Sequence, residues 1–235
     1  LDQMDMGTTY NAIGDNLVSI NWMGDLLRLN KSFVISRSGE TKKEIYTNLL
    51  KASQFIKGKL QSGNHVWIAQ KQGRSKDGLD KTDPAVLKML HIALRKECAF
   101  EDLSKVYNIV PCSVSYEIDP LAKEKSQQLK GESNKNMNED ISHIFKGVME
   151  FKGNVSLHFA DQIKGRYTPE ELAQKLDDSI LNSYELWQTN LYAYEYLRGN
   201  IDDDTYPRAI KYFNELRASM TNEDLKYIMT QYANP

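Results

Sequence analysis

Cysteine and histidine are scarce in this sequence of 235 residues, which has two of the first and four of the second. Cys98 and Cys112 stand far apart and have no histidine partners at metal-ligand spacing. A disulfide scaffold and a structural metal site are therefore not expected. Two isolated cysteines fit a reducing cytoplasm.

A dominant charge is also missing, because 30 lysines and arginines face 32 aspartates and glutamates for a net charge of -2. The basic field that attracts nucleic acid is absent, so no nucleic-acid partner is expected. No uninterrupted apolar run reaches the roughly 18 residues of a transmembrane helix, and no signal peptide is visible. The chain opens at Leu1 without an initiator methionine and reads as though it begins inside a domain.

Short β-prone runs alternate along the chain with longer stretches of helical periodicity. Strands are expected at residues 32–35, 65–69, 109–116 and 153–159. Thr41 is a good helix N-cap, and Pro84 suits the first turn of another helix. The residues after Thr41 place apolar side chains on one helical face, namely Ile45, Leu49, Ala52, Phe55, Ile56 and Leu60.

This alternation predicts an α/β fold in which a mixed sheet is flanked by helices. The segment Thr168-Pro169-Glu170-Glu171 is a strong helix start, and most of the sequence after it has helical periodicity. We therefore expect an α/β domain over residues 1–167 and a helical C-terminal extension over residues 168–235. The extension is rich in aromatic residues, which either pack it onto the domain or lie at a membrane interface.

A basic stretch that contains glycine follows one expected strand directly. It runs from Gln70 to Gly78 with the sequence QKQGRSKDG. Glycine allows tight turns and close approach of the backbone to a ligand. Arg74 suits bidentate phosphate contacts, Ser75 can add a hydroxyl donor, and Lys76 supplies a mobile positive charge. The stretch is typical of an anion-binding loop and, equally, of a solvated basic turn.

A second basic residue, Arg37, follows the strand expected at residues 32–35. Open α/β sheets usually bind ligands at the carboxyl ends of their strands. Taken alone, Arg37 reads as a surface cation. Together with Arg74, which also follows a strand, it indicates one shared anion pocket.

Several segments occur in an order that is known from one family. Phe33 to Arg37 place a Phe shortly before an Arg, Gln72 to Ser75 read Gln-Gly-Arg-Ser, and Ile109 to Glu117 form a strand with a proline. They resemble the second, third and fourth blocks of the glycerol-3-phosphate and lysophosphatidate acyltransferases. Residues 12–17 resemble the segment before the second block, and residues 153–163 are similar to the strand that commonly closes the domain. The resemblance spans roughly residues 9–165.

The resemblance implies a glycerolphosphate acyltransferase-like fold and acyl transfer from an acyl thioester to a phosphorylated glycerol or lysophospholipid. It implies that Arg37 and Arg74 hold the acceptor phosphate, with Gly73 and Ser75 shaping the loop and Lys76 adding charge. The co-substrate would be acyl-CoA or acyl carrier protein, and neither a metal nor a cofactor is expected. The protein would be cytoplasmic and peripheral to the inner face of the cell membrane.

Two departures from the family pattern concern the catalytic base and the loop. The family's first block is His-x4-Asp, in which the His acts as general base and the Asp orients it. The residues five positions after the four histidines are Gln70, Lys96, Val148 and Ile163. The motif is therefore absent from this chain and is expected upstream of Leu1. The Glu of the third block is also replaced, by Lys71 or Gln72 depending on register.

Two other classes of function stay open. A non-catalytic module that binds anionic lipid or phosphate would use the same arginines. A phosphate-binding hydrolase of unrelated α/β type has less support, because the sequence contains no nucleophile elbow, P-loop or metal cluster. A His-x4-Asp motif upstream would separate the acyltransferase from the binding module.

Overall fold

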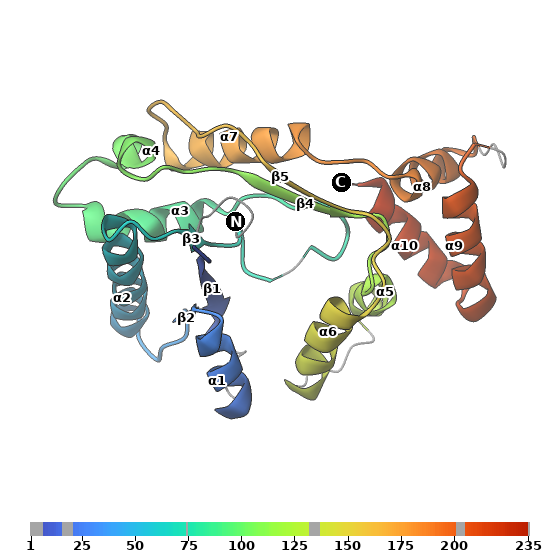
Figure 1. Cartoon of the computed structure of the whole chain (residues 1–235), viewed down its shortest axis with the longest axis horizontal. Helices are drawn as coiled ribbons and strands as arrows, with labels where there is room; N and C mark the ends of the chain where they lie inside the picture. Colours follow the sequence, from blue (N-terminus) through green and yellow to red (C-terminus); the bar gives the residue numbers. More distant parts are fainter. Residues whose placement is uncertain (1–6, 16–20, 74, 132–136, 201–204, 235) are drawn as a thin grey trace. The chain divides into compact units, whose positions relative to one another are not determined.

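The computed structural model describes residues 7–15, 21–73, 75–131, 137–200 and 205–234, and it has the expected α/β class, with helices flanking a small sheet (Figure 1). The strands are β1 (Tyr10–Gly14), β2 (Ser32–Ile35), β3 (Val66–Trp67), β4 (Cys112–Tyr116) and β5 (Val155–Phe159). The helices up to residue 149 are α1 (Asn21–Leu29), α2 (Lys42–Gln61), α3 (Pro84–His91), α4 (Leu103–Val106), α5 (Ala122–Lys130) and α6 (Met137–Met149). Helices follow β5 as expected, namely α7 (Pro169–Asn182), α8 (Gln188–Arg198), α9 (Pro207–Ser219) and α10 (Asn222–Ala233). Two short 3-10 turns are Ile92–Leu94 and Phe100–Asp102.

The chain folds into two compact units that interleave along the sequence. The first unit comprises Leu1–Gln72, Lys81–Ile109 and Gln162–Asp177. The second unit comprises Gly73–Asp80, Val110–Asp161 and Asp178–Pro235. Neither unit is a single stretch of sequence, so neither coincides with residues 1–167 or 168–235. The domain boundary after residue 167 stays a prediction.

The first unit contains a parallel sheet with the strand order β2-β1-β3. The central strand β1 pairs with β2 from Asn11 to Gly14 and with β3 at Tyr10 and Asn11. The chain passes through α1 between β1 and β2 and through α2 between β2 and β3, because parallel strands need crossover connections. β4 and β5 pair only with each other among the described strands. The expectation of one mixed sheet is therefore wrong, since parallel and antiparallel strands lie in separate sheets.

Helix α2 packs its predicted apolar face into the core of the first unit. It begins at Thr41, whose Oγ1 accepts the N–H of Glu44 at 3.2 Å in a capping box. Ala52 and Ile56 are buried as expected, while the Phe55 ring is partly exposed and stands 4.7 Å from that of Phe33 on β2. The same core includes buried side chains from later segments, namely Leu87, Met89, Leu94, Leu103, Leu172 and Leu176.

The second unit contains the antiparallel ribbon of β4 and β5, whose register pairs Ser113 with His158 and Val114 with Leu157. Ser113 and Ser115 are the buried side chains of β4, whereas Val114 and Leu157 are 39% and 58% exposed. Two polar contacts explain this inversion. Ser113 Oγ donates to the carbonyl of Ser183 at 2.8 Å, and the indole of Trp187 donates to Ser115 Oγ at 3.1 Å.

Aromatic side chains build the core of the second unit. Phe213 is fully buried, with its ring centroid 5.4 Å from those of both Tyr192 and Tyr232. Tyr192 and Phe213, two of the aromatics noted in the C-terminal sequence, are thus buried in this core, while Tyr194 is 40% exposed. The expectation that these aromatics pack the extension onto residues 1–167 stays a prediction. Within the described residues, no helix combines the length and the apolar character needed to cross a membrane.

Candidate functional site at the carboxyl edge of the parallel sheet

The carboxyl ends of β1, β2 and β3 bring polar residues to one edge of the parallel sheet. Asp15 follows β1, Ser36, Arg37 and Ser38 follow β2, and Gln72 comes shortly after β3. The strands β2 and β3 lie on opposite sides of β1. The connection from β1 to β2 therefore leads to one side of β1, and the connection from β2 to β3 leads back to the other side. Open α/β sheets bind ligands at an edge of this kind.

Asp15 joins the segments that follow β1 and β2. Its Oδ2 accepts hydrogen bonds from Ser38 Oγ at 2.7 Å and from Ser36 Oγ at 3.0 Å. These bonds, that of Ser38 foremost, hold the pKa of the Asp15 carboxyl below the ordinary value of 3.8, against the opposing effect of partial burial. The sheet edge therefore carries a fixed negative charge at neutral pH.

Arg37 links the segment after β2 to the segment after β3. Its Nη1 donates a hydrogen bond to Gln72 Oε1 at 3.3 Å, which is long for a charge-assisted bond. A guanidinium has five N–H donors, and among the described residues Arg37 has no second hydrogen-bond partner. Most of its donors are thus available to an anion. Gln72 is itself part of the predicted anion-binding stretch Gln70–Gly78, in the portion that belongs to the first unit.

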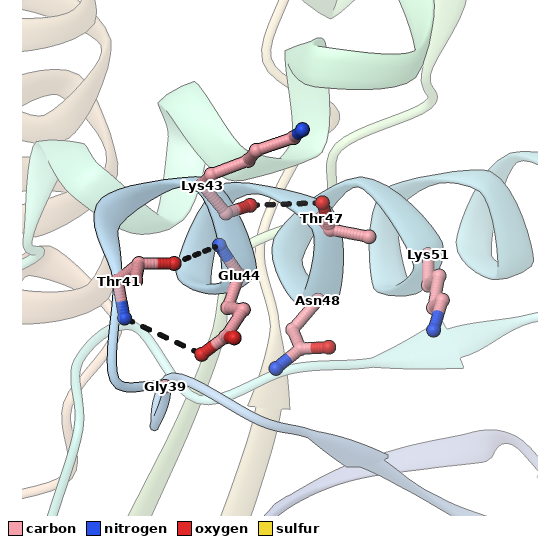
Figure 2. Close-up of a pocket in the computed structure, with 7 residues that line it drawn as sticks. All are labelled: Gly39, Thr41, Lys43, Glu44, Thr47, Asn48 and Lys51. Atoms are coloured by element: carbon pink, nitrogen blue, oxygen red, sulfur yellow. Dashed lines mark hydrogen bonds between the residues drawn. The ribbon is translucent and has the colours of Figure 1, made fainter.

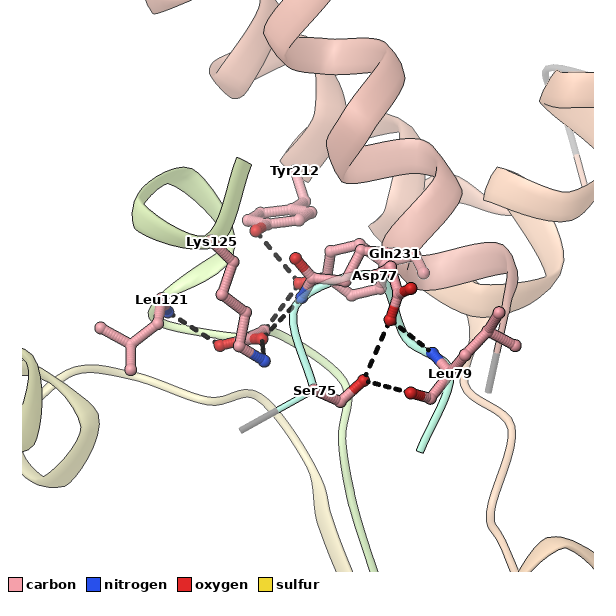
Figure 3. A network of polar contacts seen from close by, with 9 residues as sticks. Ser75, Asp77, Leu79, Leu121, Lys125, Tyr212 and Gln231 are labelled. Atoms are coloured by element: carbon pink, nitrogen blue, oxygen red, sulfur yellow. Dashed lines mark hydrogen bonds and ion pairs between the residues drawn. The ribbon is translucent and has the colours of Figure 1, made fainter. Parts of the chain in front are cut away.

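The predicted anion-binding stretch, Gln70–Gly78, is divided between the units, with Gln70–Gln72 in the first and Gly73–Gly78 in the second. The segment Gly73–Asp80 of the second unit is here called the glycine loop. Ser75 Oγ donates to the carbonyl of Leu79 at 3.0 Å, and the Leu79 N–H donates to Asp77 Oδ1 at 3.2 Å (Figure 3). These bonds close the loop on itself. The Ser75 hydroxyl therefore has an acceptor within the loop, and its predicted contact with a phosphate stays a prediction.

Two glycines set the backbone path of the glycine loop. Gly73 has φ 79° and Gly78 has φ 86°, a region that favours glycine. No described atom lies within 4 Å of the place where a Cβ on Gly73 would stand, so the backbone is open to close approach there. Lys76 has no hydrogen-bond or ion-pair partner among the described residues. Arg74 lies outside the described residues.

These observations define two candidate anion-binding groups, Arg37 in the first unit and the glycine loop in the second. No family model, curated protein or solved structure matches this chain. The interpretation of both groups therefore rests on their own chemistry. The shared pocket expected for Arg37 and Arg74 combines residues of both units and stays a prediction.

An open depression of about 470 Å³ lies beside the start of α2 in the first unit (Figure 2). It is lined by Gly39, Thr41, Lys43, Glu44, Thr47, Asn48 and Lys51. Thr41 and Glu44 cap the helix start, and Asn48 Nδ2 donates to the carbonyl of Ser38 at 3.1 Å. The bond to Ser38 shows that this region fixes the segment after β2. The lining offers neither a histidine nor a cysteine for catalysis.

The histidines have ordinary environments and supply no assigned base. His91 Nε2 donates to the carbonyl of Cys98 at 2.9 Å, and His143 is buried on α6. His65 and His158 are exposed. Among the residues that the structure describes, no three His, Cys, Asp or Glu side chains are grouped so as to hold a metal ion.

Sequence reasoning missed Asp15 and Gln72 as parts of the sheet edge. The strand-end rule that selected Arg37 applies equally to Asp15, which follows β1 directly. Gln72 lies in the predicted stretch after a strand, but its bond to Arg37 was not predicted, because the two residues are 35 positions apart. No role was predicted from the sequence for Ser36 and Ser38, although the hydroxyl groups of both donate to Asp15.

Proposed function

We propose that this chain carries the acceptor-binding part of a glycerolipid O-acyltransferase. The observation that carries the proposal is the hydrogen bond from Arg37 to Gln72. It joins the segments that resemble the second and third blocks of the acyltransferase family, at the carboxyl edge of a parallel sheet. Arg37 and Arg74 are the proposed ligands of the acceptor phosphate, with Gly73, Ser75 and Lys76 completing the loop.

The proposed reaction moves a fatty acyl group from an acyl thioester, on coenzyme A or acyl carrier protein, to a hydroxyl of the acceptor. The hydroxyl oxygen attacks the thioester carbonyl, a C–O bond forms, the C–S bond breaks, and the thiol leaves with the hydroxyl proton. Arg37 and Arg74 neutralise the acceptor phosphate and hold the hydroxyl in position. The general base is a histidine of a His-x4-Asp motif upstream of Leu1 in this proposal.

The fold and the location follow from the same proposal. The proposal assigns the parallel sheet and the β4–β5 ribbon to parts of a glycerolphosphate acyltransferase-like fold. The proposed acceptors are glycerol 3-phosphate and lysophosphatidate, because each carries a phosphate for the site to bind and a free hydroxyl close to that phosphate. A lipid product favours a cytoplasmic enzyme that is peripheral to the inner face of the membrane.

The test is a thiol-release assay on the full-length gene product, with acyl-CoA and acyl carrier protein donors and both acceptors. We expect acceptor-dependent release of thiol. Loss of charged hydrogen bonds in Arg37→Ala or Arg74→Ala should raise the acceptor KM by about 10- to 100-fold. The donor KM should change little, because neither arginine contacts the thioester in this scheme.

Arg217→Ala is the matched control, since Arg217 is an exposed arginine on α9 that bonds to Asn214 on the same helix. Its acceptor KM should equal that of the wild type. Arg37→Lys should recover part of the loss, because a lysine keeps the charge without the bidentate geometry. No thiol release with any donor and acceptor pair would refute the acyltransferase function.

A phosphate-binding module without catalysis is the second candidate. It is favoured by one observation, the lack of an Asp five residues after any of the four histidines of this chain. Binding of anionic lipid or inorganic phosphate that depends on Arg37 and Arg74, without turnover, is the result expected for it.

A further inference from the structure

The C-terminal helix α10 packs tightly against the glycine loop within the second unit. A Cβ on Gly78 would stand 2.2 Å from the carbonyl oxygen of Gln231 and 2.9 Å from Cβ of Asn234. No side chain fits at that distance from a backbone atom. Asn234 follows α10 directly, and its Nδ2 donates a hydrogen bond to the carbonyl of Asp77 at 2.9 Å. Two successive loop residues, Asp77 and Gly78, therefore touch the end of α10.

The end of α10 is itself held by polar contacts that are buried or part-buried (Figure 3). Gln231 Nε2 donates to Asp119 Oδ2 at 2.6 Å, and the Asp119 N–H donates to the Tyr232 hydroxyl at 2.6 Å. The Tyr232 hydroxyl in turn donates to that of Tyr212 at 3.1 Å. Asn190 Nδ2 donates to the carbonyl of Tyr232 at 2.9 Å. The helix end is thus joined to α8, to α9 and to the segment after β4.

Asp119, the main partner of α10, is held in place as well. Lys125 Nζ lies 2.6 Å from its Oδ2, and the Leu121 N–H donates to its Oδ1 at 2.8 Å. Side-chain exposure of both Asp119 and Lys125 is below one fifth, so water screens this ion pair only partly. Asp77 and Gly78 therefore rest on a helix end that is itself held by side-chain contacts.

We propose that α10 is the positioning element of the glycine loop and that Asn234 is a positioning residue for the acceptor phosphate. The inference rests on the proposed function, in which the loop binds that phosphate. Asn234 fixes the carbonyl of Asp77 through the hydrogen bond from its Nδ2. The C-terminal helices are then part of the acceptor site and more than an appended extension.

The experiment compares Asn234→Ala and Asn234→Asp with the wild type in the full-length protein. Both variants remove the donor to Asp77, and aspartate keeps the size of the side chain. We expect faster hydrogen exchange in residues 73–80 and an acceptor KM raised about three- to tenfold, with kcat and the donor KM unchanged. A general loss of structure would instead lower kcat and raise both KM values.

Two matched controls separate positioning from helix damage. Thr230→Ala alters the last turns of α10, but the Thr230 hydroxyl bonds to Lys226 on the same helix and not to the loop. Gly199 and Gly78 both have a positive φ, so alanine strains the backbone at either position. At Gly199 no described atom lies within 4 Å of the added Cβ, whereas at Gly78 the Cβ also clashes with Gln231. Hydrogen exchange in residues 73–80 should be faster in Gly78→Ala than in Asn234→Ala. In Thr230→Ala and Gly199→Ala, the exchange rate of these residues should equal that of the wild type.

Unchanged exchange of residues 73–80 in the Asn234 variants overturns the proposal. Faster exchange with an unchanged acceptor KM also overturns it, because α10 would then hold the loop without positioning the phosphate. A wild type without turnover refutes the acyltransferase function separately, and the Kd for inorganic phosphate then replaces KM. The proposal then requires a higher Kd for phosphate in Asn234→Ala than in the wild type. An unchanged Kd, or a wild type that does not bind phosphate, would overturn the proposal that Asn234 positions the loop for phosphate.

Discussion

At the scale of single residues, the hydroxyl groups of Ser36 and Ser38 stabilise the negative charge of Asp15 at the sheet edge. Both serines donate to the same carboxylate oxygen, and both flank Arg37 in sequence. The carboxylate therefore fixes the segment on either side of the proposed phosphate ligand. Its negative charge also means that the residues around Arg37 are not uniformly suited to an anion. Fixing the backbone is the role that its contacts support.

The pKa of Asp15 gives a test at this scale. Replacing Ser38 by Ala should raise that pKa more than replacing Ser36, because the bond from Ser38 is the larger cause of the depression. The measurement is an NMR titration of the Asp15 carboxyl in Ser38→Ala, Ser36→Ala and the wild type. A larger effect from Ser36→Ala would contradict the geometry.

The same depression has a consequence for stability against pH. Since the pKa of Asp15 is lower in the folded state than its ordinary value of 3.8, its contribution to the free energy of unfolding is present above that value. It is lost as the pH falls through the folded pKa. The stability difference between the wild type and Ser38→Ala, measured by chemical denaturation, should therefore shrink between neutral pH and pH values below 3.8. A difference that grows on acidification would refute this sign.

At the scale of elements, α2 is a helix whose start is defined by a capping box in the sequence. Thr41 accepts the Glu44 N–H, and the Glu44 carboxylate accepts the Thr41 N–H in return. Thr41→Ala should lower the free energy of unfolding by about 1 kcal/mol. Thr47→Ala is the control, because that hydroxyl bonds to the Lys43 carbonyl within the helix and alanine has the higher helix propensity.

Urea denaturation of both threonine variants gives the comparison. Thr47→Ala should leave the stability equal to that of the wild type or slightly higher. Equal losses in the two variants would mean that the capping box adds nothing beyond an ordinary hydroxyl contact. A loss confined to Thr41→Ala would confirm that α2 is set by local sequence.

Local sequence patterns predicted where helices and strands occur, but they did not predict which face of a strand is buried. Thr41 and Pro84 mark helix starts in the structure as they do in the sequence, because caps and first-turn prolines act within a few residues. The β-prone run at residues 109–116 predicted a strand, but hydrophobicity alone would bury Val114 and expose Ser113. The structure does the opposite. The buried serines depend on Ser183 and Trp187, whose contacts leave no mark in the local pattern.

At the scale of the whole molecule, contacts between distant segments decide what the sequence could not. Arg37 and the stretch Gln70–Gly78 could be proposed as anion ligands from the sequence because motif and strand-end position are local properties, and their role as ligands stays a prediction. The packing of Gly78 on Gln231 could not be predicted, since it joins residues that are far apart in the chain. The division into interleaved units has the same origin, because a compact unit is defined by such contacts and a sequence boundary is not.

The two cores offer the last test. Leu103 belongs to the core of the first unit and Ile228 to that of the second, and both side chains are fully buried. Replacing either by Ala should lower the free energy of unfolding by about 2–5 kcal/mol through lost contacts and a cavity. Leu197 on α8 is 43% exposed and provides the control. Leu197→Ala should lower the free energy of unfolding much less than either core substitution.

Hydrogen exchange distinguishes the two core variants. The glycine loop rests on α10, and Ile228 lies on α10, so Ile228→Ala should speed exchange in residues 73–80. Leu103→Ala should act on α2 and α3, whose side chains share its core, and should leave residues 73–80 close to the wild-type rate. Equal acceleration of the loop by both substitutions would mean that its order does not depend on α10 in particular. A selective effect of Ile228→Ala would assign the glycine loop to the core built by the C-terminal helices, although the sequence places it more than 100 residues before them.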